Sequence, residues 1–222
     1  MTPKPIFDWQ FAWHILPQLL SALTVTVEAV VFGMAMALVL GLAWALLRRS
    51  PRKLISRPIS LVVEVIRSTP LLIQLYFLYF VLPEAGITLS PLATGIIGLG
   101  IHYSSYTAEV YRAGIEAVPR GQWEAAWALS LSPARTWRAV ILPQAIPRVV
   151  PVLGNYFIAM FKDTPLLAAI TVAELLKTAK IIGAAEFRYL EPLTLIGALF
   201  LVISLLASQV VGFLERRYGT SF

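Results

Sequence analysis

The sequence predicts an all-α integral membrane protein with five transmembrane helices. Of its 222 residues, 58% are hydrophobic and only 14% are charged, and the mean hydropathy is +0.77. A soluble domain of this size needs more polar surface than that. Several apolar runs also reach the roughly 20 residues that a helix needs to cross a bilayer. We therefore expect residues 1–222 to form a single membrane domain.

The expected spans cover about half of the chain and contain few charges. The first is interrupted only by Glu28, and the second contains Glu64 and Arg67. No GxxxG motif and no internal repeat is recognised among them. In chain order, the expected spans are residues 19–47, 59–82, 92–110, 146–161 and 193–214.

At each end of the fourth span, the sequence pattern leaves two alternative structures open. Residues 166–176 are apolar but too short to cross a bilayer, so an interfacial or re-entrant helix is expected there. Around the start of the span, prolines recur every fourth residue, and each removes a helical hydrogen bond. This spacing favours either a bent helix or an irregular loop. The prolines are Pro143, Pro147 and Pro151.

The distribution of Lys and Arg predicts the orientation. Basic residues gather after the first span, after the third span and in the tail, whereas the other connections are leaner or mixed in charge. Short basic connections stay in the cytoplasm. The N-terminus is therefore expected outside and the C-terminus in the cytoplasm. This topology accounts for the net charge of +6, so no nucleic-acid partner is expected.

One long polar connection, residues 114–145, is expected to be cytoplasmic and structured. Pro119 suits the first turn of a helix, where its missing N–H is harmless. Ser132 followed by Pro133 is a second start signal. We therefore expect two short helices with a turn at residues 130–132.

The same connection carries a spaced motif. It reads Glu124-Ala125-Ala126, three residues, Ser130, nine residues, then residues 140–143 as V-I-L-P. This resembles the EAA loop of ATP-binding-cassette importer permeases, with Ser130 and Val140 in place of the usual Gly and Ile. The resemblance implies a coupling helix that docks on an ATPase subunit. By shape alone, the segment could also be an amphipathic helix on the membrane surface. The expected docking residues are Gly121, Trp123, Glu124, Ala125, Ala126 and Ser130.

Further blocks are similar to the polar amino-acid uptake permeases, of the histidine, glutamine and arginine type. Residues 67–74 read R-S-T-P-L-L-I-Q, residues 106–115 read Y-T-A-E-V-Y-R-A-G-I, and residues 162–164 read K-D-T. The likeness covers about residues 15 to 217. The wording is nearest to the ectoine and hydroxyectoine permeases, so the implied substrates are polar amino acids or related zwitterionic compatible solutes.

Polar residues inside spans are costly and usually line a pathway or pair internally. Glu64 and Arg67 share a helix face and form either a structural ion pair or part of a pathway. The Lys162 trio could bind a zwitterion, or it could be a snorkelling Lys beside a capping Asp. His102 could face a cavity or make a buried hydrogen bond. The pathway candidates are Glu28, Glu64, Arg67, His102, Tyr103, Lys162, Asp163 and Thr164.

The chain has no GxxxxGK[ST] phosphate loop, no cysteine, and no recognisable catalytic or metal motif. We therefore expect a transport subunit of the cell inner membrane, not an enzyme. The resemblance implies an ATP-binding subunit dimer that carries ATP and Mg, a second permease subunit that is identical or a sister, and an external substrate-binding protein. The alternative is an ion-coupled secondary transporter or a channel. Its signature, paired broken spans or an inverted repeat, is not recognised.

Overall fold

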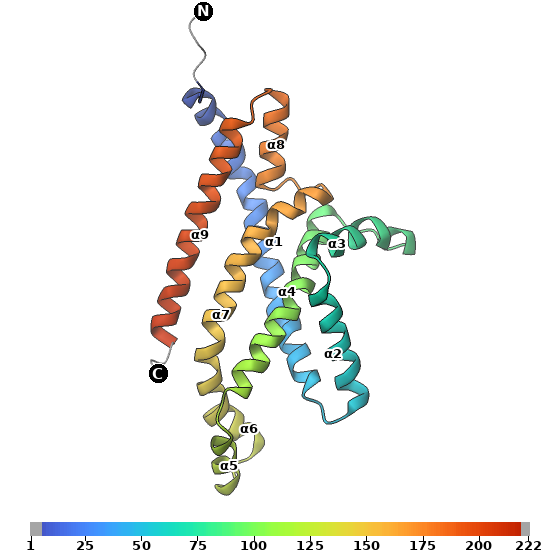
Figure 1. Cartoon of the computed structure of the whole chain (residues 1–222), viewed down its shortest axis with the longest axis vertical. Coiled ribbons are helices and arrows are strands. Elements are labelled where there is room, and N and C mark those ends of the chain that lie inside the picture. The colour runs from blue at the N-terminus through green and yellow to red at the C-terminus, as the bar shows by residue number, and fades with distance from the viewer. Residues whose placement is uncertain (1–5, 219–222) are drawn as a thin grey trace, which may run out of the picture.

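The computed structural model describes residues 6–218 of the chain, and the fold of this part is helical throughout, without strands (Figure 1). The expected all-α class is confirmed. The longest helices run lengthwise beside one another, and the chain direction alternates from each to the next (Figure 1). They are α1 (Trp9–Arg48), α2 (Lys53–Ser68), α4 (Pro91–Glu116), α7 (Leu142–Asp163) and α9 (Leu190–Tyr218).

Two of the described helices, α1 and α9, are long and apolar enough to cross a membrane. The bent pair formed by α2 and the segment after it is a third candidate when counted as one span. Helices α4 and α7 run lengthwise in the same bundle but carry more polar residues. Helix α1 is longer than expected, because it begins at Trp9, where Asp8 caps it by accepting bonds from two backbone N–H groups.

Helices α1 and α4 form the main helix pair, and small residues make their close approach possible. A Cβ atom added at Gly41 would lie 1.9 Å from Thr107 Oγ1 and 2.9 Å from the Ser104 carbonyl oxygen. Thr107 Oγ1 also donates to the Ala37 carbonyl at 2.8 Å. On α1, the small residues form a stripe along one face. This small-residue stripe was missed in the sequence because alanine alternates with glycine in it, although it packs membrane helices in the same way as a GxxxG motif. Its buried members are Ala29, Gly33, Ala37, Gly41 and Ala45.

The second expected span is not one straight helix. Helix α2 ends at Ser68, and the chain bends by 105° into α3 (Leu71–Tyr76), η1 (Phe77–Val81, a π-helix) and η2 (Leu82–Ala85). Pro70 causes the break, because it keeps Thr69 in an extended conformation. The expectation of one continuous helix over residues 59–82 was therefore wrong. In Figure 1, the segment after the bend projects sideways from the bundle.

The segment 166–176 also differs from expectation, because it is not a single helix. The chain forms η4 (Thr164–Ile170), turns at Thr171 with a left-handed φ of 66°, and only then enters α8 (Leu175–Ala185). Glu174 starts the new helix, since its carboxylate accepts the backbone N–H groups of Leu176 and Lys177. This cap offers the backbone a new helix start in place of a continuous helix.

Candidate functional site: an exposed helical hairpin and a polar cluster

An exposed helical hairpin lies at one end of the bundle, between α4 and α7 (Figure 1). It consists of α5 (Arg120–Ala128) and α6 (Pro133–Thr136), and we call it the α5–α6 hairpin. The start signals at Pro119 and Ser132 were placed correctly. The second helix is not short, however. It continues through η3 (Trp137–Ile141, a π-helix) into α7. Pro143, Pro147 and Pro151 therefore lie in a helix and not in an irregular loop.

The turn of the hairpin explains why its motif usually has glycine. Ser130 has a φ of 53°, in the left-handed region that glycine adopts without strain. The N–H of Ser130 donates to the Trp127 carbonyl at 2.9 Å, and the N–H of Leu131 donates to the Ala126 carbonyl at 3.0 Å. These two bonds form a Schellman motif that closes α5.

The predicted docking residues divide into an inner and an outer set. Ala126 is 2% exposed and packs against its own chain, and Trp123 is half-buried. Glu124 and Ala125 are exposed, and so is Gly121, around which an added Cβ would meet no atom within 4 Å. Trp127, which carries the second indole of α5, is 85% exposed. It is therefore the free aromatic side chain of the hairpin.

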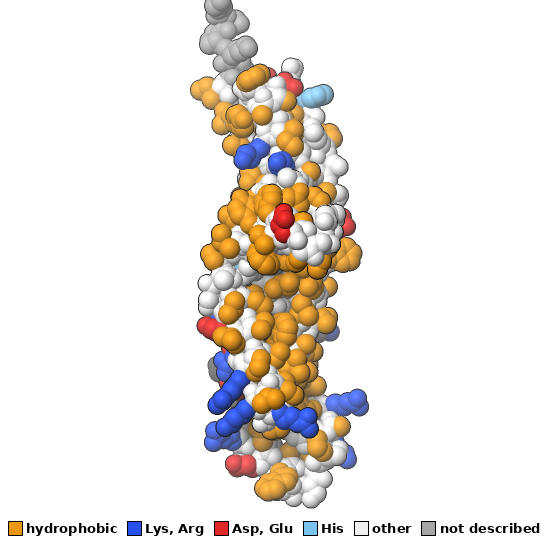
Figure 2. All heavy atoms as spheres, turned by 90° about the vertical axis from the view of Figure 1, so that its right-hand side faces the viewer, with side chains coloured by type: hydrophobic (Ala, Val, Ile, Leu, Met, Phe, Trp, Pro, Cys, Tyr) orange, Lys and Arg blue, Asp and Glu red, His pale blue; other side chains and the backbone are white. Residues whose placement is uncertain are grey.

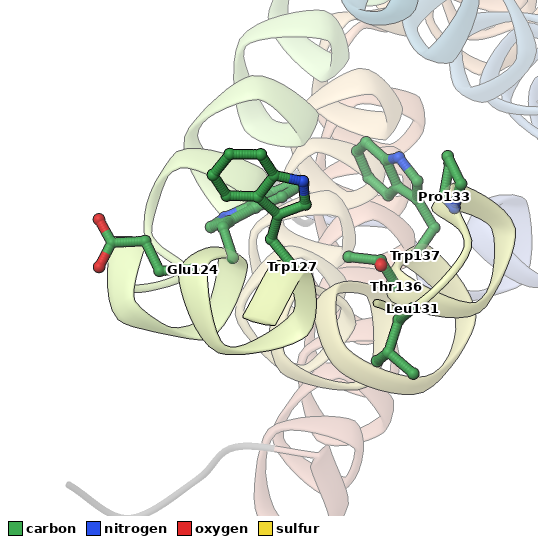
Figure 3. Close-up of a pocket in the computed structure, with 7 residues that line it drawn as sticks. Glu124, Trp127, Leu131, Pro133, Thr136 and Trp137 are labelled. Atoms are coloured by element: carbon green, nitrogen blue, oxygen red, sulfur yellow. The ribbon is translucent and has the colours of Figure 1, made fainter. Parts of the chain in front are cut away.

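A groove of about 400 Å³ runs between α5 and the start of the next helix. Figure 3 shows Trp127 standing on the α5 side and Pro133 and Trp137 on the other. Glu124 also lines the groove, and its carboxylate extends to the side opposite Pro133 and Trp137 (Figure 3). The hairpin thus presents a carboxylate, an exposed indole and an apolar groove to any partner that approaches this end.

The hairpin is held to the bundle by a small core of its own. Ile115, Val118, Ile141 and Ala145 are buried together, and Trp123 and Trp137 pack against them. The two indole rings meet edge to face, with 5.5 Å between their centroids. This core belongs to the ends of α4 and α7, so the hairpin is fixed to two of the lengthwise helices.

Basic side chains gather at the end of the molecule where α2 begins. Figure 2 shows Lys and Arg collected there on the α2 side of the molecule, below an apolar band. The exposed residues of this segment include Arg52, Lys53 and Arg57. The beginning of α2 and the α5–α6 hairpin lie toward the same end of the molecule (Figure 1).

A second group of polar residues lies within the bundle, where α4 faces α3 and α7. His102 Nδ1 is 3.2 Å from Gln74 Oε1. Gln74 Nε2 donates to the Ile66 carbonyl at 2.7 Å and to Thr69 Oγ1 at 2.7 Å. The Gln74 side chain therefore bonds the backbone carbonyl at the α2–α3 break and ties the break to His102.

On the α7 side, Tyr103 and Asp163 complete the group. The Tyr103 hydroxyl donates to Asp163 Oδ2 at 2.7 Å. Tyr106 and Tyr156 extend it as a row of rings, with 5.5 Å between their centroids. We call this set the polar cluster. Its members are Thr69, Gln74, His102, Tyr103, Tyr106, Tyr156 and Asp163.

An ion-pair network lies nearer the hairpin end of α4. Glu64 and Arg67 do pair, at 3.4 Å, and Arg67 also approaches Glu109 at 3.9 Å. Glu109 accepts from Arg48 at 2.5 Å and from Arg112 at 2.7 Å. The network therefore joins the ends of α1 and α2 to α4.

The remaining pathway candidates do not converge. Glu28 is exposed on α1 beside Val31 and Phe32. Lys162 is exposed and lines a shallow groove with residues of α9. Thr164 is fully buried and donates to the Phe161 carbonyl at 2.8 Å. The structure thus places the Lys162, Asp163 and Thr164 side chains in three different environments.

Several residues of the two sites were missed in the sequence. Gln74 and Tyr106 lie inside the family-like blocks and could have been selected, because both are polar residues within predicted spans. Tyr156 is likewise a polar residue within a predicted span. Its partners and that of Arg48 could not be inferred, however, because they lie about 50 to 60 residues away in the chain. These contacts depend on the packing of α4 against α7 and α1.

Comparison with known proteins adds sequence and structural relatives. Residues 37–220 match the family described as "Binding-protein-dependent transport system inner membrane component". The chain is 50% identical to a probable amino-acid ABC transporter permease protein, y4tG, of Sinorhizobium fredii, over 90% of this chain and 87% of that one. It is 36% identical to the glutamine transport system permease protein GlnP of Escherichia coli (strain K12), over 95% and 97%.

A solved structure, titled as an amino acid ABC transporter with histidines, is also similar. The TM-score is 0.90 and the identity 37%, over 96% of this chain and all of the other. The apolar lengthwise helices and the exposed hairpin with its spaced motif define an inner-membrane transport subunit, not an enzyme. The chain belongs to the family of binding-protein-dependent transport system inner membrane components.

Proposed function

We propose that this chain is the permease subunit of an ATP-binding-cassette importer, and that the α5–α6 hairpin docks on a separate ATP-binding subunit. The observation that carries the proposal is the division of the hairpin into two sides. Trp123 and Ala126 fix it to the bundle, while Glu124, Ala125 and Trp127 stand exposed. An exposed indole beside a carboxylate is typical of an interface anchor.

The topology that goes with this proposal has five spans, with the N-terminus outside and the C-terminus in the cytoplasm. The alternating direction of α1, α2, α4, α7 and α9 supports it (Figure 1), as does the gathering of exposed Lys and Arg at the hairpin end (Figure 2). The break at Pro70 would then lie within the membrane. Irregular backbone at that depth is tolerated where protein or a water-filled cavity covers it, and Gln74 partly meets this need.

The substrate pathway in this proposal runs along the polar cluster. A zwitterionic substrate needs an acceptor for its ammonium group and donors for its carboxylate. Asp163 and the ring faces of Tyr106 and Tyr156 suit the cation, while His102 and the hydroxyls of the cluster offer donors. Glu64 and Arg67 lie in the neighbouring ion-pair network, which suits a gate that opens and closes beside the cluster.

The proposed substrates are polar amino acids. Ectoine and hydroxyectoine are the alternative substrates, and they are assayed second. Support for amino acids comes from the relatives, whose names specify amino acids or glutamine, and from the solved structure titled with histidines. An external binding protein would deliver the substrate. A second permease subunit, identical or a sister, would complete the pathway, and ATP and Mg would be held by the ATP-binding subunits.

Transport by the reconstituted complex tests this function. The permease is co-expressed with its ATP-binding subunit, placed in liposomes and supplied with the loaded binding protein. Uptake should require ATP and persist when ionophores collapse ion gradients. Uptake that survives ATP depletion but stops with ionophores would instead establish an ion-coupled transporter.

A charge reversal tests the hairpin itself. Glu124→Arg should abolish ATP-driven uptake, because it places a repelling charge at the docking surface, while membrane insertion remains normal. Glu84→Arg is the matched control, since Glu84 is an exposed acid of η2, outside the hairpin. Normal uptake by Glu124→Arg would count against the docking role.

A further inference from the structure

An arginine from the end of α1 reaches the inner side of the α5–α6 hairpin. Arg49 follows the last residue of α1, and its guanidinium carbon lies 5.9 Å from the Trp123 ring centroid and 5.7 Å from the Trp137 ring centroid. These distances are within the range of cation–π attraction, which is strongest for indole rings. Arg49 therefore contacts both rings of the edge-to-face pair at once.

The Arg49 side chain has no competing ionic partner in residues 6–218. The ion pairs of this part of the molecule use Arg48, Arg67, Arg112 and Arg188, and none involves Arg49. Its neighbour Arg48 instead donates hydrogen bonds to Glu109 and Ser60. Two successive arginines thus divide between two tasks, one in the ion-pair network and one against the indoles.

The contact joins parts of the fold that are distant in sequence. The core beneath the hairpin comes from the ends of α4 and α7, the helices that run directly into and out of it. Gln144 and Gln122 add a hydrogen bond of 3.3 Å within the same local region. Arg49 instead brings in α1, which packs lengthwise against α4 through the small-residue stripe.

We propose that Arg49 is a positioning residue for energy coupling. It holds Trp123 and Trp137 in a fixed orientation relative to α1, so that movement of the hairpin displaces α1 and α4 together. A planar guanidinium stacks on the face of an aromatic ring and stays charged there. The ammonium group of lysine is compact and strongly hydrated, so it stacks on a ring less well. This inference rests on the proposed docking function of the hairpin, and it adds the route by which that movement reaches the membrane helices.

The test is the amount of substrate imported per ATP hydrolysed by the reconstituted complex. Arg49→Met keeps the length of the side chain but removes its charge, and Arg49→Lys keeps the charge but removes the planar group. Arg52→Met is the matched control, because Arg52 lies in the same connection, is exposed and contacts neither ring.

We expect Arg49→Met to lower the import per ATP about fivefold, the loss that two exposed cation–π contacts would cause. Assembly with the ATP-binding subunit and ATP hydrolysis should persist in this variant. Arg49→Lys should fall between it and the wild type, and Arg52→Met should match the wild type. In the background of Trp123→Leu, Arg49→Met should have a smaller effect than in the wild type, because only the contact with Trp137 is left to remove.

Three results would overturn the inference. These are an unchanged import per ATP in Arg49→Met, an equal loss in Arg52→Met, and failure of Arg49→Met to bind the ATP-binding subunit. The second result would assign the effect to general positive charge, and the third to direct contact with the partner. Failure of the wild-type chain to import in an ATP-dependent manner would instead refute the proposed function, so the two outcomes are distinct.

Discussion

Removing the indole of Trp127 should weaken binding of the ATP-binding subunit strongly. A large aromatic side chain buries about 150–250 Å² when it is covered. Trp127 is 85% exposed in this structure, so docking could cover roughly 200 Å² of it. At about 25 cal/mol per Å², the gain has a ceiling of roughly 5 kcal/mol. Truncation of central interface aromatics costs about 2 to 4 kcal/mol.

We therefore expect Trp127→Ala to raise the Kd for the ATP-binding subunit by roughly 30-fold to several hundredfold. The assay is equilibrium binding of the purified ATP-binding subunit to the permease in nanodiscs. The hairpin should keep its fold, because Trp127 lies outside the buried core formed around Ile115 and Ile141.

Leu54→Ala provides the matched control for this measurement. Leu54 is 91% exposed on α2 and also presents a free apolar side chain, but it lies outside the hairpin. Its removal should leave the Kd unchanged. A change of less than about threefold in Trp127→Ala, or an equal effect of Leu54→Ala, would refute the assignment of Trp127 as the docking anchor.

Three further substitutions test other parts of the account. Gly41→Ala should lower the free energy of unfolding by about 1–3 kcal/mol in a detergent thermal melt, because its Cβ meets Thr107 and backbone atoms of α4. Gly197→Ala, whose Cβ meets nothing within 4 Å, should leave the free energy of unfolding unchanged. Equal melting temperatures for the two variants would contradict the close contact at Gly41. Ser130→Val should cost about 1 kcal/mol at the left-handed turn, whereas Ser130→Gly should be tolerated; the same melt measures both, and a stable valine variant would exclude the strain. Tyr103→Phe should alter substrate uptake while ATP hydrolysis continues, because it frees the Asp163 carboxylate, and unchanged uptake kinetics would remove this pair from the pathway.

The sequence predicted well the features that depend on local pattern. Apolar length predicted the lengthwise helices, and Pro119 and Ser132 predicted where the hairpin helices begin. The spaced motif predicted the family. The left-handed φ of Ser130 gives the physical reason for the glycine usual at that position.

Features that depend on three-dimensional packing were not predictable in the same way. Pro70 was visible, but a proline alone does not set a bend of 105°. The η4 turn before α8 depends on the cap made by Glu174, and the polar cluster depends on α4 meeting α3 and α7. Likewise, the contact of Arg49 with Trp123 and Trp137 joins residues that no sequence spacing relates.

In the proposed function, the α5–α6 hairpin faces the cytoplasm and is covered by the ATP-binding subunit. The chain has no cysteine, so Ala125→Cys introduces a single thiol at an exposed position of α5. A membrane-impermeant maleimide should label this thiol only in inside-out vesicles, and addition of the ATP-binding subunit should protect it. Labelling from the outside, or labelling that the subunit does not reduce, would contradict the account.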